Sequence, residues 1–241
     1  MKRIYGGASA TEGQFPYHVL ILTLKGGTAF GCSGTILSSS WVLTAAHCMC
    51  TEGKTTTRVV IKYGSASQST ALRQEVKRFI VHPRFAKNES PFFMVNDIAL
   101  LELCAPLDMS LPGVKPICFT KEDLAYSGTV TVTGWGKTSG TIFPESLQHV
   151  DLNIYPVNMC KRLYNIFKAG IRDEWNKICT FTKDKYPCDG DSGGPLVAEV
   201  SPGCHIQLGI TSYGTCTSIL PNVATKLSSF ADWICESTSL C

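Results

Sequence analysis

The sequence predicts an all-β fold, either a barrel or a sandwich. Runs rich in Val, Ile, Leu and Thr recur along the 241 residues, and clusters of Gly, Pro, Ser or Asn bound most of them. These runs are spaced roughly 8–20 residues apart, and no long stretch of helical periodicity separates them. Hydrophobic residues make up 44% and charged residues 17% of the chain, as expected for a folded protein with a sizeable core.

Each predicted strand is a run of about four to eight residues in which β-branched and other apolar side chains dominate. In chain order, these runs are Tyr17–Leu24, Gly34–Leu37, Trp41–Thr44, Arg58–Tyr63, Val76–Val81, Ile98–Leu103, Thr129–Thr133, Val150–Ile154, Pro195–Val200 and Ile206–Thr211. We find no internal repeat, low-complexity segment or linker, so the sequence alone places no domain boundary.

Two segments predict helices instead of strands. In residues 157–167, Met159, Leu163 and Phe167 recur at a four-residue spacing, which places them on one helical face. In residues 228–240, a Ser precedes aromatic and aliphatic residues that share a face, as at a capped helix start.

The charge balance excludes several classes of partner. The 22 Lys and Arg residues against 19 Asp and Glu leave a net charge of +3, and no run of like charge occurs. We therefore expect neither a nucleic acid nor an anionic membrane as a partner. The longest apolar stretch, Val19–Leu24, is far shorter than the ~20 residues that a membrane-spanning helix needs.

Twelve cysteines, an even count, indicate the compartment. A chain of this length does not need disulfides to build a core, so they point to an oxidising environment and a secreted or lumenal protein. A zinc site is the alternative, but the only close pair, Cys48 and Cys50, is too tightly spaced for the usual ligands.

No apolar leader precedes Ile4, which suggests a mature or zymogen-like form whose leader has been replaced. The one Asn-x-Ser site, at Asn88, is weakened by the Pro that follows it.

Three short segments carry the side chains of a possible catalytic site. They read TAAHC, NDIAL and GDSGGP, and they contain His47, Asp97 and Ser192. Taken singly, each has a structural explanation: a His in a packed strand end, an Asp in a turn, a Ser in a tight glycine loop. A base, an acid and a nucleophile together form the set that activates a serine hydroxyl.

These segments, with IYGG at residues 4–7, GWG at 134–136, SYG at 212–214 and FADWI at 230–234, resemble the chymotrypsin/trypsin family of serine endopeptidases. The resemblance runs from Ile4 to the C-terminal helix. It implies two antiparallel six-stranded barrels, with the active site in the cleft between them, and a C-terminal helix. The barrels would span roughly residues 4–115 and 116–226, with the helix at 228–240 and residues 1–3 left as an activation segment.

The resemblance also implies the catalytic roles. His47 would take the proton of Ser192 as that hydroxyl attacks a peptide carbonyl, and Asp97 would hold the imidazole in the required tautomer. The backbone N–H groups of Gly190 and Ser192 would form the oxyanion hole. No cofactor is expected, because this chemistry needs none.

A second implied pair concerns activation. Cleavage between Arg3 and Ile4 would release an ammonium group at Ile4 that pairs with a buried Asp191. Such a carboxylate is costly without its partner, so the uncut chain would be a zymogen, and a protease with basic specificity would be its activating partner. The alternative is that Arg3 is a remnant with no role.

The resemblance implies the disulfides Cys32–Cys48, Cys160–Cys179 and Cys188–Cys216. The partners of the other cysteines stay open, with Cys204 as our first choice for Cys118. The unassigned cysteines are Cys50, Cys104, Cys118, Cys204, Cys235 and Cys241.

The expected specificity pocket comprises Tyr186, Asp189, Ser212, Tyr213, Gly214 and Asn222. Tyr186 stands where relatives carry the residue of the pocket floor, and Asn222 replaces a usual Gly, while Ala224 replaces a Tyr and returns some volume. We therefore expect a filled or shallow pocket with no floor charge, which disfavours cleavage after Lys or Arg. A charge on Asp189 at the rim would be solvated and would attract basic residues only weakly.

We expect no metal site. Residues 61–74, where relatives often carry a calcium loop, contain no Asp or Glu ahead of Glu75. The histidines outside the catalytic set read as structural or exposed; they are His18, His82, His149 and His205.

Two functions follow from different weighting of these residues. The intact catalytic set favours a secreted, monomeric endopeptidase of restricted specificity, with polypeptide substrates and protein protease inhibitors as partners. Tyr186 and Asn222 favour a binding protein built on the protease scaffold, with an occluded pocket and little or no activity.

Overall fold

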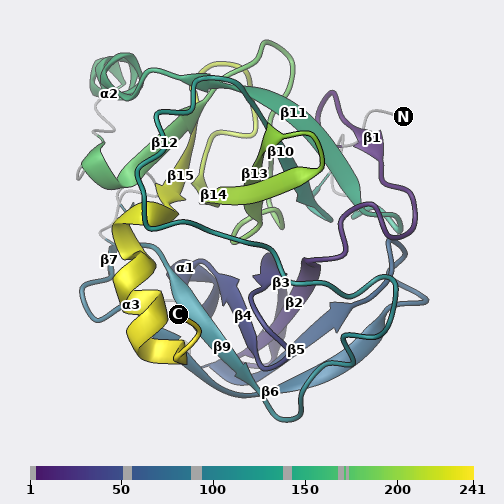
Figure 1. Cartoon of the computed structure of the whole chain (residues 1–241). Helices are drawn as coiled ribbons and strands as arrows, with labels where there is room; N and C mark the ends of the chain where they lie inside the picture. The colour runs from purple at the N-terminus through teal and green to yellow at the C-terminus, as the bar shows by residue number, and fades with distance from the viewer. Residues whose placement is uncertain (1–3, 51–55, 88–93, 138–142, 168–170, 172–173) are drawn as a thin grey trace.

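The structure, a computed structural model, describes residues 4–50, 56–87, 94–137, 143–167, 171 and 174–241. Its strands form two barrels, one above the other in Figure 1, and the chain completes the first before it builds the second. The predicted all-β fold of two six-stranded antiparallel barrels is confirmed.

The first barrel closes in the order β2-β3-β4-β9-β6-β5. Alternate residues of these strands point inward, and the barrel core includes Val19, Ile21, Val42, Ile61 and Leu100. The strands are β2 (His18–Lys25), β3 (Thr28–Ile36), β4 (Trp41–Thr44), β5 (Thr56–Tyr63), β6 (Leu72–Val81) and β9 (Ala99–Leu103).

The second barrel follows the order β11-β10-β13-β14-β15-β12, and β12 pairs back to β11 to close it. Its core is rich in Val and Leu, including Val130, Val132, Val150, Leu152 and Leu196. The strands are β10 (Thr129–Gly134), β11 (Gln148–Tyr155), β12 (Lys177–Thr180), β13 (Pro195–Ser201), β14 (Cys204–Tyr213) and β15 (Asn222–Lys226).

The start of the chain lies against the second barrel. The short strand β1 (Ala8–Ser9) pairs with β11, and Ile4 is buried among the core residues of the second barrel. The first residues of the span 4–115 therefore pack on the barrel that follows it in sequence. Tyr5 also pairs with Tyr186, six residues before Ser192.

Both predicted helices form. α2 (Val157–Ile166) matches its prediction closely, and the C-terminal segment begins as a 3₁₀ turn, η2 (Leu227–Phe230), before α3 (Ala231–Thr238). Apolar residues of η2 and α3 pack into the core of the first barrel, beside which α3 lies in Figure 1. The remaining elements are α1 (Ala46–Met49), β7 (Ala86–Lys87), β8 (Met94–Val95) and η1 (Glu174–Asn176). No helix in the described ranges is long and apolar enough to cross a membrane.

Candidate active site

The pairing of two strands brings His47 and Asp97 together. Thr44 at the end of β4 pairs with Ala99 at the start of β9, so the short segment that follows one strand lies beside the segment that leads into the other. The Nδ1 atom of His47 lies 2.8 Å from Oδ2 of Asp97. The backbone N–H of His47 donates to Oδ1 of the same carboxylate at 2.9 Å. Asp97 therefore fixes both the ring and the backbone of His47.

Asp97 is fully buried, and the second barrel completes its surroundings. Ser212 Oγ donates to Asp97 Oδ2 at 2.5 Å, and Thr225 Oγ1 donates to the Asp97 carbonyl at 3.0 Å. Burial raises the pKa of Asp97, but the attraction of His47 and the hydrogen bonds from His47 and Ser212 outweigh it, and the pKa is lowered. The carboxylate thus stays ionised and accepts the Nδ1 proton of His47, which leaves Nε2 free to act as a base.

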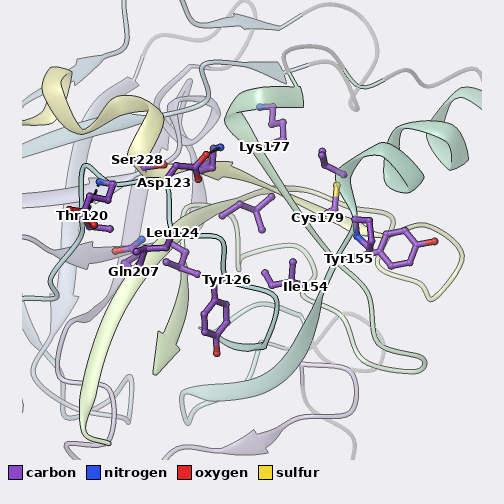
Figure 2. Close-up of a pocket in the computed structure, with 16 residues that line it drawn as sticks. Thr120, Asp123, Leu124, Tyr126, Ile154, Tyr155, Lys177, Cys179, Gln207 and Ser228 are labelled. Atoms are coloured by element: carbon purple, nitrogen blue, oxygen red, sulfur yellow. Dashed lines mark hydrogen bonds and ion pairs between the residues drawn. The ribbon is translucent and has the colours of Figure 1, made fainter. Parts of the chain in front are cut away.

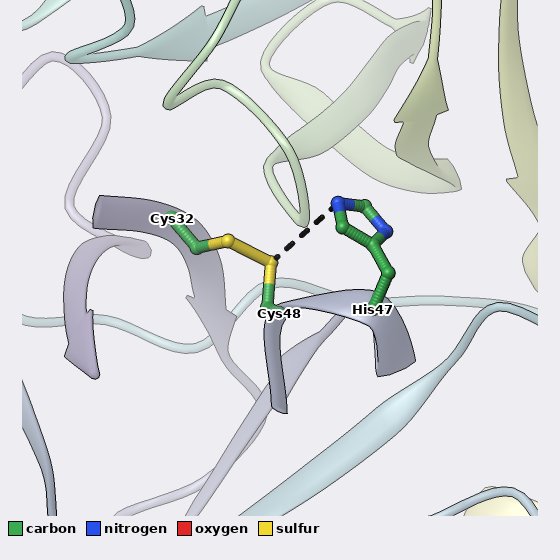
Figure 3. Close-up of side chains that lie close together, drawn as sticks. All are labelled: Cys32, His47 and Cys48. Carbon is green, nitrogen blue, oxygen red and sulfur yellow. Dashed lines mark hydrogen bonds between the residues drawn. A yellow bond between two sulfur atoms is a disulfide. The ribbon is translucent and has the colours of Figure 1, made fainter. Parts of the chain in front are cut away.

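Figure 3 shows the other side of the imidazole. The ring lies beside the disulfide Cys32–Cys48, with Nε2 3.9 Å from Cys48 Sγ. A disulfide sulfur carries no proton to donate, so this contact leaves the lone pair of Nε2 available. The disulfide also ties β3 to α1, which limits how far His47 can move.

Ser192 lies in the glycine-rich turn between Cys188 and β13. Its carbonyl accepts from the N–H of Ser33 on β3 at 2.8 Å, and the next N–H, of Gly193, donates to Thr211 on β14 at 2.8 Å. The turn is therefore held by both barrels. Ser192 and His47 line the same groove, which encloses about 280 Å³.

The backbone of this turn needs glycine at Gly190. Its φ of +99° is one that side chains rarely adopt, and a Cβ there would lie 2.9 Å from the Cα of Gly136. In the described part of the chain, the backbone N–H groups of Gly190 and Ser192 have no acceptor. Two such donors beside a nucleophile can stabilise an oxyanion.

Comparison with known proteins identifies the family. A sequence profile described as trypsin matches residues 4–234. The chain is 37% identical over 239 residues to chymotrypsin-2 of Vespa crabro, across 96% of this chain and 98% of that one. It is 31% identical to trypsin alpha-4 of Lucilia cuprina, across 98% of this chain and 88% of the other. The chain belongs to the trypsin family.

This trypsin-family chain is a serine endopeptidase by homology. A further relative, phenoloxidase-activating factor 3 of Holotrichia diomphalia, is 31% identical across 96% of this chain and 71% of its own. The names of these relatives include both a chymotrypsin and a trypsin, so sequence similarity alone does not establish which residue the enzyme prefers before the scissile bond.

Asp191 of this trypsin-family protease is a buried carboxylate held by backbone donors. The N–H groups of Gly136 and Cys188 donate to its two oxygens at 2.8 and 2.9 Å. Burial raises its pKa to about 7, with a smaller contribution from the nearby charge of Asp189, and the two hydrogen bonds only partly offset this. None of the ion pairs in the described ranges includes Asp191.

The uncut chain is therefore expected to lose stability as the pH rises between about 4 and about 7. The unfolded Asp titrates near pH ~3.9, so in this range only the folded state still holds the proton. The melting temperature of the uncut Ser192→Ala chain, followed across this range, should fall. An Asp191→Asn version should lack this component, and identical pH profiles of the two proteins would contradict the prediction.

The groove beside Ser192 includes most, but not all, of the residues expected in the specificity pocket. Asp189, Ser212, Tyr213 and Gly214 line it, together with Thr211, which the sequence reading missed. Thr211 directly precedes the SYG segment of residues 212–214, and this position beside the motif is the signal that could have identified it as a groove residue. Further lining residues are Met94, Pro187, Cys188 and Cys216.

Tyr186 is not in the groove, and our expectation that its ring would fill the pocket is corrected. The ring stacks on Tyr5, with centroids 4.7 Å apart and planes 5° from parallel, and the Tyr186 N–H donates to the Tyr5 carbonyl at 3.3 Å. The stacking and the backbone hydrogen bond to Tyr5 hold the Tyr186 ring out of the groove. Asn222 is not one of the residues that line the groove, but its Oδ1 lies against Gly214, which does line it.

The rim charge has a partner that the sequence did not reveal. Lys137 Nζ donates to Asp189 Oδ2 at 3.0 Å, and the Lys137 N–H donates to the Asp189 carbonyl at 2.7 Å. Lys137 follows the GWG segment directly, but nothing in that position indicates a partner so far along the chain. The pair further weakens a rim charge that we had expected to attract basic residues only weakly.

The structure contains the disulfides Cys32–Cys48, Cys160–Cys179 and Cys188–Cys216, and a further one, Cys235–Cys241, at the end of α3. Our first choice for Cys118 is wrong for this structure, because Cys118 and Cys204 are both unpaired. The backbone of Cys118 instead forms an isolated parallel β-bridge with the backbone of Ile206, two residues beyond Cys204. Cys50 and Cys104 are also free thiols.

The clusters that could hold a metal in the described ranges are made of disulfide sulfurs with His47 or Asp189. Disulfide sulfurs are poor ligands because the thiolate is consumed. A separate cavity of about 200 Å³ lies on the second barrel and shares no lining residue with the groove (Figure 2). Leu124 and Ile154 contribute to its apolar wall, and Lys226 at its rim already pairs with Asp123 at 2.8 Å. We assign no reaction to it.

Proposed function

We propose that this chain is a secreted serine endopeptidase made as a zymogen, with His47, Asp97 and Ser192 as its catalytic residues. The observation that carries the proposal is the buried network on Asp97, which receives hydrogen bonds from His47 and Ser212 while His47 and Ser192 share one groove. These residues come from both barrels, so the site exists only when the barrels are packed together.

The geometry supports a two-step hydrolysis. His47 Nε2 takes the proton of Ser192 Oγ as that oxygen attacks the peptide carbonyl, and the N–H groups of Gly190 and Ser192 bind the resulting oxyanion. The imidazolium, stabilised by Asp97, then gives its proton to the departing amine, leaving an acyl-enzyme. Water attacks the acyl carbon with the same base, and the products are an acid and a free Ser192.

Cleavage between Arg3 and Ile4 is the proposed activating step. Ile4 is already buried in the second barrel, and its neighbour Tyr5 pairs with Tyr186, five residues before Asp191. The Asp191 carboxylate is held without a cation in the described ranges. An ammonium group created at Ile4 would supply the missing charge and stabilise the Gly190–Ser192 turn. The partner would be a protease that cuts after basic residues.

Specificity is proposed to differ from that of trypsin. Among the described residues that line the groove, the one carboxylate is Asp189, and it is already paired with Lys137. A substrate Lys or Arg would therefore meet no free negative charge. We expect the enzyme to activate itself poorly at Arg3. The disulfides support secretion, since such bonds persist in oxidising compartments.

The test is labelling by a small organophosphorus probe that reacts with activated serines. Protein cut to begin at Ile4 should be labelled, whereas the uncut chain and a cut Ser192→Ala chain should not. A small probe makes little demand on the pocket, so it reports the nucleophile and the oxyanion donors alone. Absence of labelling in correctly cut, folded protein would reject catalysis by this site. It would favour the binding-protein alternative, for which the closeness of Asn222 Oδ1 to the Gly214 wall of the groove is the supporting observation.

A further inference from the structure

Two buried polar atoms beside the groove have no hydrogen-bond partner among the described residues. They are Oγ1 of Thr211 and Oδ1 of Asn222, in residues whose exposed fractions are only 7% and 6%. Most buried polar atoms in folded proteins are paired, because an unpaired one loses its hydration without compensation. Two such atoms next to a substrate groove indicate a ligand that pairs with them.

Thr211 is held in the wall of the groove. Its carbonyl accepts from Gly193 and its N–H donates to Gly194, each at 2.8 Å, so its backbone is fixed to the turn that carries Ser192. Its side chain carries a hydroxyl that can donate and accept, and the residue lines the groove with Ser192 and His47. Rotation about χ1 is enough to turn this hydroxyl toward a bound side chain.

Asn222 lies on the neighbouring strand, on the same face of the sheet as Thr211. β14 pairs with β15 through Thr211 and Ala224, and Asn222 is two residues before Ala224. A Cβ placed on Gly214 would lie 2.6 Å from Asn222 Oδ1, so the carboxamide oxygen is aimed at the Gly214 wall of the groove. Thr211 therefore lines the groove directly, and Asn222 reaches its Gly214 wall from the adjacent strand.

The groove offers these hydrogen-bonding groups without a free charge. Asp189 is engaged by Lys137, and burial raises the pKa of Tyr213, which keeps that phenol neutral. A charged side chain would enter without a counter-charge, and an aliphatic one would leave both polar atoms unpaired. A neutral side chain with one donor and one acceptor satisfies both.

We propose that this enzyme prefers a carboxamide side chain, Gln or Asn, immediately before the scissile bond. The carboxamide oxygen would accept from the Thr211 hydroxyl, and its NH₂ group would donate to Asn222 Oδ1. This inference rests on the proposed function, since it names the substrate side chain that the same groove selects. Sites built to hydrogen-bond a substrate group discriminate strongly against analogues that lack it.

The experiment uses the full chain cut to begin at Ile4 and fluorogenic peptides that differ only in the residue before the cleaved bond. Gln and Asn are compared with Met, Leu, Glu and Lys. We expect kcat/KM for Gln or Asn to exceed that for the apolar residue of similar size by about tenfold or more. Labelling by the organophosphorus probe, measured on the same preparation, checks the nucleophile separately.

Two variants test the assigned residues. Thr211→Val keeps the shape and removes the hydroxyl, and Asn222→Leu removes the carboxamide; each should reduce the Gln-to-Met ratio of kcat/KM by about tenfold. Thr129→Val, on an exposed face of β10, is the matched control and should keep the ratio. Melting temperatures establish that each variant is folded.

The outcomes separate the two proposals. Labelled enzyme that prefers Met, Leu, Lys or Glu, or that cuts none of the peptides, overturns the carboxamide preference while the catalytic residues stand. A Gln preference that survives in both variants also overturns it, because other groups would then read the side chain. Absence of labelling rejects the proposed function, and the inference falls with it.

Discussion

Replacing Asp97 with asparagine is expected to lower kcat about ten-thousandfold, a size taken from the equivalent change in related triads. Asp97 accepts from His47 Nδ1 at 2.8 Å, which places the remaining lone pair of the neutral ring on Nε2. An Asn amide can donate to Nδ1 instead, and the ring proton then moves to Nε2. In that tautomer His47 cannot take the proton of Ser192.

Steady-state hydrolysis by the enzyme cut to begin at Ile4 measures this effect. Asp151→Asn is the matched control, because Asp151 is an exposed carboxylate that hydrogen-bonds Thr131 on the outside of the second barrel. The control should retain its rate. A loss below about tenfold in Asp97→Asn would show that another group orients His47, and the catalytic assignment would then need revision.

The second large effect is expected at Asp191. Its replacement by asparagine should lower kcat/KM of the cut enzyme at least about a hundredfold, since removing one partner of a buried ion pair costs about 3–5 kcal/mol. An Asn would keep one of the two backbone hydrogen bonds but leave the ammonium of Ile4 without a counter-charge. The turn from Gly190 to Ser192 would then lose its active conformation.

N-terminal sequencing establishes that the Asp191→Asn chain has been cut at Arg3, and kcat/KM is then measured against the cut wild type. Asp232→Asn serves as the control, because Asp232, on α3, forms an exposed ion pair with Lys121. A variant within threefold of wild type, or an uncut wild type as active as the cut one, contradicts the proposed activation.

Runs of apolar and β-branched residues were enough to predict most strands, but they did not predict two strands of the second barrel. β12 and β15 are short and mix polar with apolar residues, so neither shows a clear period of two. They form because each is paired on both sides, β12 between β11 and β15, and β15 between β14 and β12. Pairing across the sheet supplies the stability that their own sequence does not.

The sequence also did not predict where individual side chains point. Tyr186 occupies the expected place in the chain, yet its ring stacks on Tyr5 because the N-terminal segment pairs with it there. Lys137 lies far from Asp189 in sequence, and only the packed loops bring the two together. That Thr211 Oγ1 and Asn222 Oδ1 have no hydrogen-bond partner among the described residues depends on the packing of β14 and β15, which the sequence does not show.

The sequence by itself determined the family and the two-barrel fold, and it pointed to His47, Asp97 and Ser192 as the proposed catalytic residues. Those properties depend on residue type and order, which the motifs state directly. Only the tertiary structure shows that Cys118 and Cys204 are free thiols, that Asp189 pairs with Lys137, and which residues line the groove. Each of these depends on distances between residues remote in sequence, and such distances are set by strand register and by how the barrels and loops pack.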